Sequence, residues 1–136
     1  RFADGEVKVM VATNAFGLGV NIPDIRLVIH HSPSIGLDEY IQEAGRAGRD
    51  GRQAKAVLLW HPYDFTINRG LIEKAKLQLT GKQRKERLAA LDALQAYAQD
   101  EEHCRWRMVR KFFGEPKGDR CYDQCDNCFC RDEDWL

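Results

Sequence analysis

The first sixty residues alternate between short apolar runs and polar or glycine-rich segments. Residues 7–12 have the alternation and the β-branched side chains typical of a strand, and residues 27–30 and 54–60 are short apolar runs suited to buried parallel strands. Between these two runs, residues 37–47 have apolar positions at helical spacing and acidic residues in the first turn, where the helix dipole favours them. The order strand, loop, strand, helix, strand predicts an α/β fold with part of a parallel sheet and crossover helices.

After Pro62 the apolar positions recur at helical spacing only. The residue before a proline is biased away from helix, so we place a boundary there. Residues 1–62 are predicted to form the sheet-containing unit and residues 63–136 a helical unit with an acidic tail. Three helices are expected in the second unit: residues 65–79 with an end at Gly81, residues 84–100, and residues 104–113 with an end at Gly114.

The chain has 136 residues and a formal net charge of zero, so any basic surface must be local. No apolar stretch is long enough for a membrane span, and the first residues have no signal-peptide pattern, so we expect neither a membrane partner nor secretion. The sequence opens without a methionine, just before a strand-like run. We therefore treat it as a piece of a longer protein.

Two arginines, Arg46 and Arg49, are each preceded by a glycine and lie three residues apart, a spacing that puts both on one face of a helix. Guanidinium groups bind phosphate oxygens in pairs, and glycine lets a ligand approach the backbone. The alternative is a solvated basic helix end. Ligands of parallel sheets collect at the carboxyl ends of strands. Both this helix end and the glycine-containing loop over residues 13–19 are candidates for that edge, although the loop glycines could serve tight turns only.

Five cysteines lie between residues 104 and 130, an odd number that does not suit a secreted disulfide scaffold. Clustered thiolates favour a metal, and tetrahedral zinc takes four of them. Cys125 and Cys128 form a C-x2-C knuckle that Cys121 precedes by four residues. The expected zinc ligands are Cys104, Cys121, Cys125 and Cys128. Cys130 could replace one of them in a shifted register, His103 is a weaker competitor, and a disulfide or inert buried thiols remain alternatives.

Residues 42–51, Gln-Glu-Ala-Gly-Arg-Ala-Gly-Arg-Asp-Gly, resemble motif VI of the superfamily-two helicases, specifically the RecQ family. Residues 11–24 resemble motif V, and Cys104-Arg105 with the cysteines at 121, 125 and 128 resembles the RecQ zinc-binding module. The resemblance covers nearly the whole chain. It implies a partial RecA-like second lobe followed by a small helical domain with a structural zinc ion held by the four cysteines chosen above.

For ATP, the resemblance implies roles for three residues of motif VI. Arg49 would be the arginine finger for the γ-phosphate, Arg46 would contact phosphate or hold the catalytic carboxylate, and Gln42 would couple the nucleotide to motif V. Other residues would approach the nucleotide or brace its loop: Gly19, Asn21 and Asp24. ATP and Mg²⁺ would be bound mainly by the first RecA-like lobe, a partner outside this sequence.

For DNA, the resemblance places Thr13 and Asn14 where the family contacts a phosphate of the tracking strand. Ile22 stands where a lysine is expected after the asparagine, so the contact of that lysine cannot be transferred. Arg105 is a further candidate for DNA contact within a basic helical region. The alternatives are a solvated helix face, packing against the sheet unit, or pairing with acids near the metal.

The sequence is therefore interpreted as the rear part of an ATP-dependent DNA helicase, 3′ to 5′ by resemblance, acting on single-stranded and duplex DNA in repair and recombination. It contains no phosphate-loop motif, so we expect the chain alone to be inactive. The main alternative is a zinc-stabilised DNA-binding or scaffolding module whose helicase-like lobe does not cycle. A third is an RNA helicase or a chromatin-remodelling motor, which the cysteine spacing disfavours. The expected location is cytoplasmic (nucleoid) in a bacterium and nuclear in a eukaryote.

Overall fold

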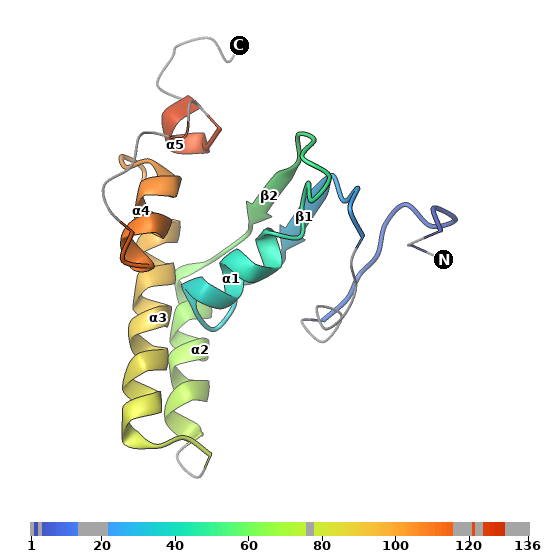
Figure 1. Ribbon diagram of the computed structural model, residues 1–136. Coiled ribbons are helices and arrows are strands. Elements are labelled where there is room, and N and C mark those ends of the chain that lie inside the picture. Colours follow the sequence, from blue (N-terminus) through green and yellow to red (C-terminus); the bar gives the residue numbers. More distant parts are fainter. Residues whose placement is uncertain are drawn as a thin grey trace.

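The computed structural model describes residues 2, 4–13, 22–75, 78–115, 121 and 124–129. Within these residues, a two-stranded sheet lies beside a short helix and a pair of longer helices (Figure 1). β1 (Leu27–His30) and β2 (Lys55–Leu58) pair in parallel, with Leu27 opposite Lys55. The helix between them, α1 (Leu37–Ala44), makes the crossover that a parallel pair requires. The predicted α/β arrangement of these three elements is confirmed.

The strand expected over residues 7–12 is wrong for this structure. In the described part of the chain the sheet consists of β1 and β2, and the side chains of Val9 and Val11 are 75% and 97% exposed. Strand preference reflects packing against neighbouring strands more than an intrinsic property of the backbone. The alternating valines meet no packed surface here, so the segment stays irregular.

Among the residues described after the sheet there are four helices: α2 (Pro62–Lys74), α3 (Gly81–Gln99), α4 (Arg105–Phe112) and α5 (Asp126–Phe129). The first three were predicted, but Gly81 begins α3 instead of ending the helix before it. Thr80 and Gln83 form a reciprocal capping box, in which each side chain binds the other's backbone amide. This cap fixes the start of α3 three residues before the predicted one. No helix in the described ranges has both the length and the apolar content needed to cross a bilayer.

The main buried cluster joins the sheet unit to the helical unit. It combines Leu37 and Tyr40 of α1 with residues of the long helices: Phe65 and Ile72 of α2, and Leu91 and Leu94 of α3. In Figure 1, α1 lies against the α2–α3 pair, near the end of the sheet. The side-chain amide of Asn68 adds hydrogen bonds to the carbonyls of Pro33 and Ser34, at 3.0 and 3.2 Å. The boundary at Pro62 stays a prediction. The buried cluster contains residues from both sides of Pro62, so the two predicted units share one apolar core.

Candidate functional site

Arg46 and Arg49 lie in a series of turns just after α1. The helix ends at Ala44, so the expectation that both arginines share one helical face is wrong. Gly48 and Gly51 have φ values of +66° and +78°, in the left-handed region that favours glycine. These values cannot continue a right-handed helix. Arg46 is half-buried and Arg49 is exposed, so neither guanidinium group is sealed inside the core.

The arginine-bearing turn is docked on the segment just before β1. The amide of Gly48 donates to the carbonyl of Ile25 at 2.9 Å, and the amide of Asp50 donates to the carbonyl of Pro23 at 3.1 Å. Arg26 strengthens the contact through an ion pair with Asp50 at 2.7 Å and a hydrogen bond to the carbonyl of Asp24 at 2.9 Å. The end of the motif V-like segment and the motif VI-like turn are therefore held together.

This contact lies at the amino ends of the strands. Arg26 directly precedes β1, and its carbonyl accepts from the amide of Lys55, the first residue of β2, at 2.9 Å. The expectation that Arg46 and Arg49 lie at the carboxyl edge is wrong. In a parallel crossover, α1 returns the chain from the carboxyl end of one strand to the amino end of the next. A segment between α1 and β2 is thus positioned at the amino edge.

Glu43 fixes the side of α1 that faces the sheet. Its Oε2 accepts from the Oγ of Ser34 at 2.6 Å and lies 2.8 Å from the Nε2 of His30, at the end of β1. The ring of His30 also meets the ring of Tyr40 edge-on, with centroids 5.0 Å apart. Gln42, the neighbour of Glu43, is exposed. No local sequence signal marks the pair of His30 and Glu43, because it joins a strand to the following helix.

The remaining candidates of the motif V-like region divide into two groups. Thr13 and Asp24 are described and exposed, so both are accessible to a ligand. Asn14, Gly19 and Asn21 lie outside the described residues.

The four chosen cysteines come together. The Sγ atoms of Cys104, Cys121, Cys125 and Cys128 all lie within 4.8 Å of one another, and none of the four is in a disulfide. Zinc–sulfur bonds of about 2.3 Å give sulfur separations of about 3.8 Å in a tetrahedron, so small side-chain shifts would accommodate zinc. His103 is exposed and pairs with Asp100 at 2.8 Å. Cys130 lies outside the described residues.

The pKa values of these clustered thiols are shifted in opposite directions. Burial opposes a charge on Cys104, but hydrogen bonds from the backbone at Arg107 and Cys121 lower its pKa to about 6. Burial raises the pKa of Cys128, and hydrogen bonding to Cys125 and Cys104 raises it further. Four thiolates packed together repel one another, and a divalent ion among them removes that penalty. Zinc bound here would supply the charge that lets all four sulfurs act as ligands.

The two residues inside the C-x2-C knuckle anchor it to the helices. Asp126 accepts two hydrogen bonds from Arg105, both at 2.9 Å, and the buried Asn127 donates to the carbonyls of Asp100 and His103 at 2.9 and 2.8 Å. The guanidinium of Arg105 also bonds the carbonyl of Tyr97 and lies over its ring. Pairing with an acid near the metal, an alternative weighed for Arg105, is thus observed. DNA contact by Arg105 stays a prediction.

Two family models match the chain. Residues 1–51 match the helicase conserved C-terminal domain, and residues 62–129 match the RecQ zinc-binding domain, which spans half of the chain. The chain belongs to the RecQ family. Its four clustered cysteines lie within the second match, and the motif VI-like turn lies within the first. A zinc-binding domain of the RecQ type therefore follows part of a helicase lobe.

Curated relatives cover nearly all of this RecQ-family chain. An ATP-dependent DNA helicase RecQ of Bacillus subtilis is 41% identical over 94% of the chain and 21% of its own length. An ATP-dependent DNA helicase Q1 of Rattus norvegicus is 36% identical over 98% of the chain and 20% of its own length. A putative ATP-dependent RNA helicase of Acanthamoeba polyphaga mimivirus is 36% identical over 93% of the chain and 22% of its own length. The chain thus spans about a fifth of these relatives.

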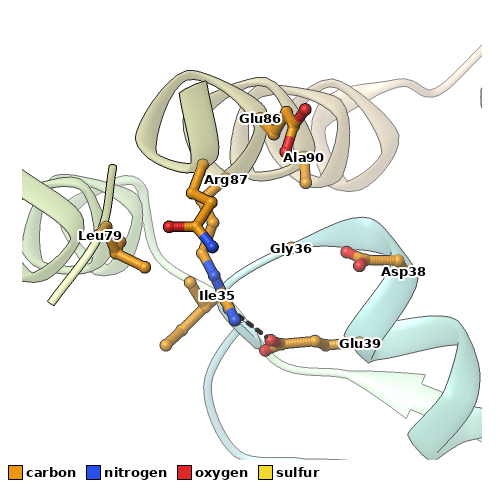
Figure 2. Close-up of a pocket in the computed structure, with 9 residues that line it drawn as sticks. Ile35, Gly36, Asp38, Glu39, Leu79, Glu86, Arg87 and Ala90 are labelled. Carbon is orange, nitrogen blue, oxygen red and sulfur yellow. Dashed lines mark hydrogen bonds and ion pairs between the residues drawn. The ribbon is translucent and has the colours of Figure 1, made fainter. Parts of the chain in front are cut away.

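A cavity of about 310 Å³ lies where the start of α1 meets α3 in this RecQ-family chain (Figure 2). Its wall includes Asp38, Glu39 and Glu86, and Arg87 spans it to bind Glu39 at 2.7 Å. None of the predicted site residues within the described ranges lines it. Because carboxylates repel phosphate, this cavity is not a candidate site for ATP or DNA.

Proposed function

We propose that the intact protein is an ATP-dependent DNA helicase of the RecQ type, to which this chain contributes the arginines of the nucleotide site. The observation that carries the proposal is the docking of the Arg46–Arg49 turn on the segment with Asp24. Two backbone hydrogen bonds and the Arg26–Asp50 ion pair hold the motif VI-like turn against the end of the motif V-like segment. The named helicase relatives support the same activity.

Arg49 is proposed as the arginine finger, with Arg46 contacting phosphate or holding the catalytic carboxylate. Phosphoryl transfer spreads negative charge over the γ-phosphoryl oxygens, and a guanidinium group supplied from outside the primary pocket is worth about 10³–10⁵ in rate. An exposed Arg49 suits that task, because the backbone on either side of it is hydrogen-bonded to the segment before β1. Gln42, exposed on α1, is proposed to couple the nucleotide to motif V.

The motif V-like segment is proposed to serve both ligands. Gly19, Asn21 and Asp24 would lie toward the nucleotide, and Thr13 and Asn14 toward a phosphate of the tracking DNA strand. ATP and Mg²⁺ would be held mainly by the first RecA-like lobe. Because the arginines lie on a different lobe, hydrolysis would depend on lobe closure, and closure can be coupled to movement along DNA. The proposed polarity is 3′ to 5′.

The zinc ion is proposed to be structural. Cys104, Cys121, Cys125 and Cys128 would supply four thiolate ligands. A four-coordinate zinc ion held by four protein ligands would keep no position for a reactive water. Binding energy at such a site becomes folding energy for the short segment around α5, whose described contacts are mostly polar.

The test is DNA-stimulated ATP hydrolysis by the intact protein, in the wild type and in Arg49→Ala. We expect turnover to fall about 10³-fold or more, with ATP affinity changed only a few-fold, because the nucleotide is bound mainly by the other lobe. Arg52→Ala is the matched control, since Arg52 is exposed in the same turn and has no proposed role at phosphate. Undiminished turnover in Arg49→Ala would refute the finger assignment.

Polarity and cycling are tested with the same preparation. Unwinding of a 3′-tailed duplex but not a 5′-tailed one is expected with ATP and Mg²⁺. DNA binding without any DNA-stimulated hydrolysis in the wild type would instead favour the scaffolding module with a lobe that does not cycle.

A further inference from the structure

The side chain of Tyr97, in the last turn of α3, is in contact with the guanidinium group of Arg105. The Cζ atom of Arg105 lies 5.1 Å from the centre of the Tyr97 ring, and its Nη1 donates to the carbonyl of Tyr97. A cation over an aromatic ring is attracted by the negative face of that ring. The other nitrogens of Arg105 donate to Asp126, inside the C-x2-C knuckle. Tyr97 is therefore connected, through Arg105, to the segment that carries two of the four clustered cysteines.

Tyr97 also contacts α1. Its ring centroid lies 5.6 Å from that of Tyr40, at an interplanar angle of 51°. Tyr40 is buried, with 4% of its surface exposed. Burial raises the pKa of Tyr97, and its interaction with Tyr40 raises that pKa further, so the phenol stays neutral. A buried neutral hydroxyl group needs a polar partner, and each of these two side chains offers one to the other.

Tyr40 connects this contact to the sheet. The ring of His30, at the end of β1, meets the ring of Tyr40 edge-on, and the Nε2 of the same histidine lies 2.8 Å from the carboxylate of Glu43. Tyr40 and Glu43 are both residues of α1, which packs against β1 and against α3 (Figure 1). The helix is thus held from two directions, by the sheet through His30 and by α3 through Tyr97.

The position of α1 determines where the arginine-bearing turn begins. The helix ends at Ala44, and the turn with Arg46 follows directly. Tyr40 lies about one turn before that end, and backbone hydrogen bonds link successive turns of a helix, so a displacement at Tyr40 reaches Ala44. The turn itself is held by the amides of Gly48 and Asp50, which donate to carbonyls of the segment before β1. The strength of these two hydrogen bonds therefore reports the position of α1.

Packing alone does not account for a tyrosine at position 97. Leucine would fill apolar volume, but Arg105 contacts the face of the ring and Tyr40 interacts with the side chain of Tyr97. A second link between α1 and α3, the ion pair of Arg87 with Glu39, involves partly exposed side chains and contributes little. The contacts of Tyr97 thus form the buried connection between α1 and the arginine that holds the knuckle.

We propose that Tyr97 is a positioning residue for the motif VI-like turn, which it couples to the zinc-binding domain through Arg105 and Tyr40. This inference deepens the proposed helicase function and rests on it. The knuckle would influence, through α1, where Arg46 and Arg49 stand relative to the nucleotide. Energetic coupling between distant sites is carried by packed side chains and hydrogen bonds of this kind.

The first measurement is backbone hydrogen exchange of residues 45–51 in the intact protein, loaded with zinc and followed by mass spectrometry. Tyr97→Leu removes the ring and is expected to speed exchange in this segment about 10-fold, whereas Tyr97→Phe keeps the ring beside Arg105 and should stay within about threefold of the wild type. Asp126→Asn, at the other end of the path, should speed exchange about threefold or more.

Two variants outside the path are the controls. Tyr63→Leu removes an exposed tyrosine from α2, and Ile72→Val removes core volume from the same helix. Each should change exchange of residues 45–51 by less than about twofold, because neither side chain contributes to the contacts of Tyr97. Zinc content and circular dichroism verify folding of every variant.

DNA-stimulated ATP hydrolysis is the second measurement. Tyr97→Leu should lower kcat about 10-fold and leave the KM for ATP within about twofold, because the arginines act on the transferred phosphoryl group while the nucleotide is bound mainly by the other lobe. The double variant Tyr97→Leu with Asp126→Asn should be no slower than the slower single variant, since both substitutions interrupt one path.

Three outcomes would overturn the inference. Wild-type exchange of residues 45–51 in Tyr97→Leu would show that the tyrosine does not position the turn. An equal change in Ile72→Val would assign the effect to general destabilisation. Additive losses in the double variant would show that Tyr97 and Asp126 act independently. If Tyr97→Leu does not fold, exchange in Asp126→Asn decides the question.

Hydrogen exchange separates this inference from the proposed function, because it does not depend on catalysis. Faster exchange in Tyr97→Leu, together with undiminished turnover in Arg49→Ala, would reject the arginine finger and keep the coupling. Wild-type exchange and kcat in Tyr97→Leu, together with lost turnover in Arg49→Ala, would reject only the coupling.

Discussion

Arg105 and Asp126 form a bidentate ion pair, in which Nε and Nη2 of Arg105 each donate to one carboxylate oxygen of Asp126 at 2.9 Å. The two residues are 21 positions apart, and Asp126 lies inside the C-x2-C knuckle. The first turn of α4 is thereby tied to the segment that supplies two of the four cysteines. Arginine suits this position because its planar fork matches both oxygens, whereas lysine offers a single point charge.

Loss of this pair should loosen the knuckle. We expect Arg105→Ala to lower the free energy of unfolding by about 1–3 kcal/mol, the cost of removing hydrogen bonds to a charged group. The lower part of that range is favoured because the side chain of Asp126 is 62% exposed and screened by water. Urea unfolding with zinc present measures the change. Arg107→Ala, on the outer side of the same helix, should alter stability by less than Arg105→Ala, and the reverse order would contradict this account.

Metal content should distinguish the four clustered cysteines from the fifth. Cys125→Ala removes one of four convergent thiolates, so the purified protein is expected to lose most of its zinc and the structure around α5. Cys130→Ala is the matched control and should keep one zinc per chain. Emission spectrometry of the metal content is the measurement. Zinc retained by Cys125→Ala but lost by Cys130→Ala would establish the shifted register instead.

Gly48 and Gly51 provide a matched test of the arginine-bearing turn. Both have positive φ, so alanine at either position should cost about 1 kcal/mol or somewhat more of backbone strain. A Cβ at Gly48 would also lie 2.7 Å from the carbonyl oxygen of Arg52, whereas one at Gly51 meets nothing within 4 Å. Gly48→Ala should therefore destabilise the protein more, which chemical denaturation can measure. Equal losses in the two variants would show that the close approach at Gly48 is relieved by small movements.

The docking of this turn should weaken in acid. The hydrogen bond from Arg26 lowers the pKa of Asp50 below its ordinary value of 3.8. Because the folded pKa is the lower one, the stabilising contribution is complete above pH 3.8 and is lost as the pH falls through the depressed folded value. Carboxyl ¹³C chemical shifts during an acid titration would follow Asp50 directly. Arg26→Gln should raise this pKa toward the ordinary value, and an unchanged titration would remove Arg26 as its cause.

Local patterns in the sequence were sufficient for several features. The parallel pair with its crossover helix follows from short apolar runs around an amphipathic segment, because each pattern has the period of one element. The cysteine spacing predicted a cluster that the structure assembles, since a C-x2-C knuckle already places two thiolates near each other. The resemblance to the RecQ family was also visible in the sequence, because its motifs are short runs of consecutive residues. The family models confirmed that resemblance.

Other features depend on contacts between distant segments, and only the tertiary structure decided them. The arginine-bearing turn lies at the amino edge of the sheet because α1 reverses the chain direction. Arg105 faces inward because it donates hydrogen bonds to Asp126 and to the carbonyl of Tyr97. Trp106 and Phe113 are exposed. Residues 7–12 have a strand pattern but no described partner strand. The periodicity of the sequence predicts which side chains share a face of a helix or strand. Packing between distant segments determines what that face contacts.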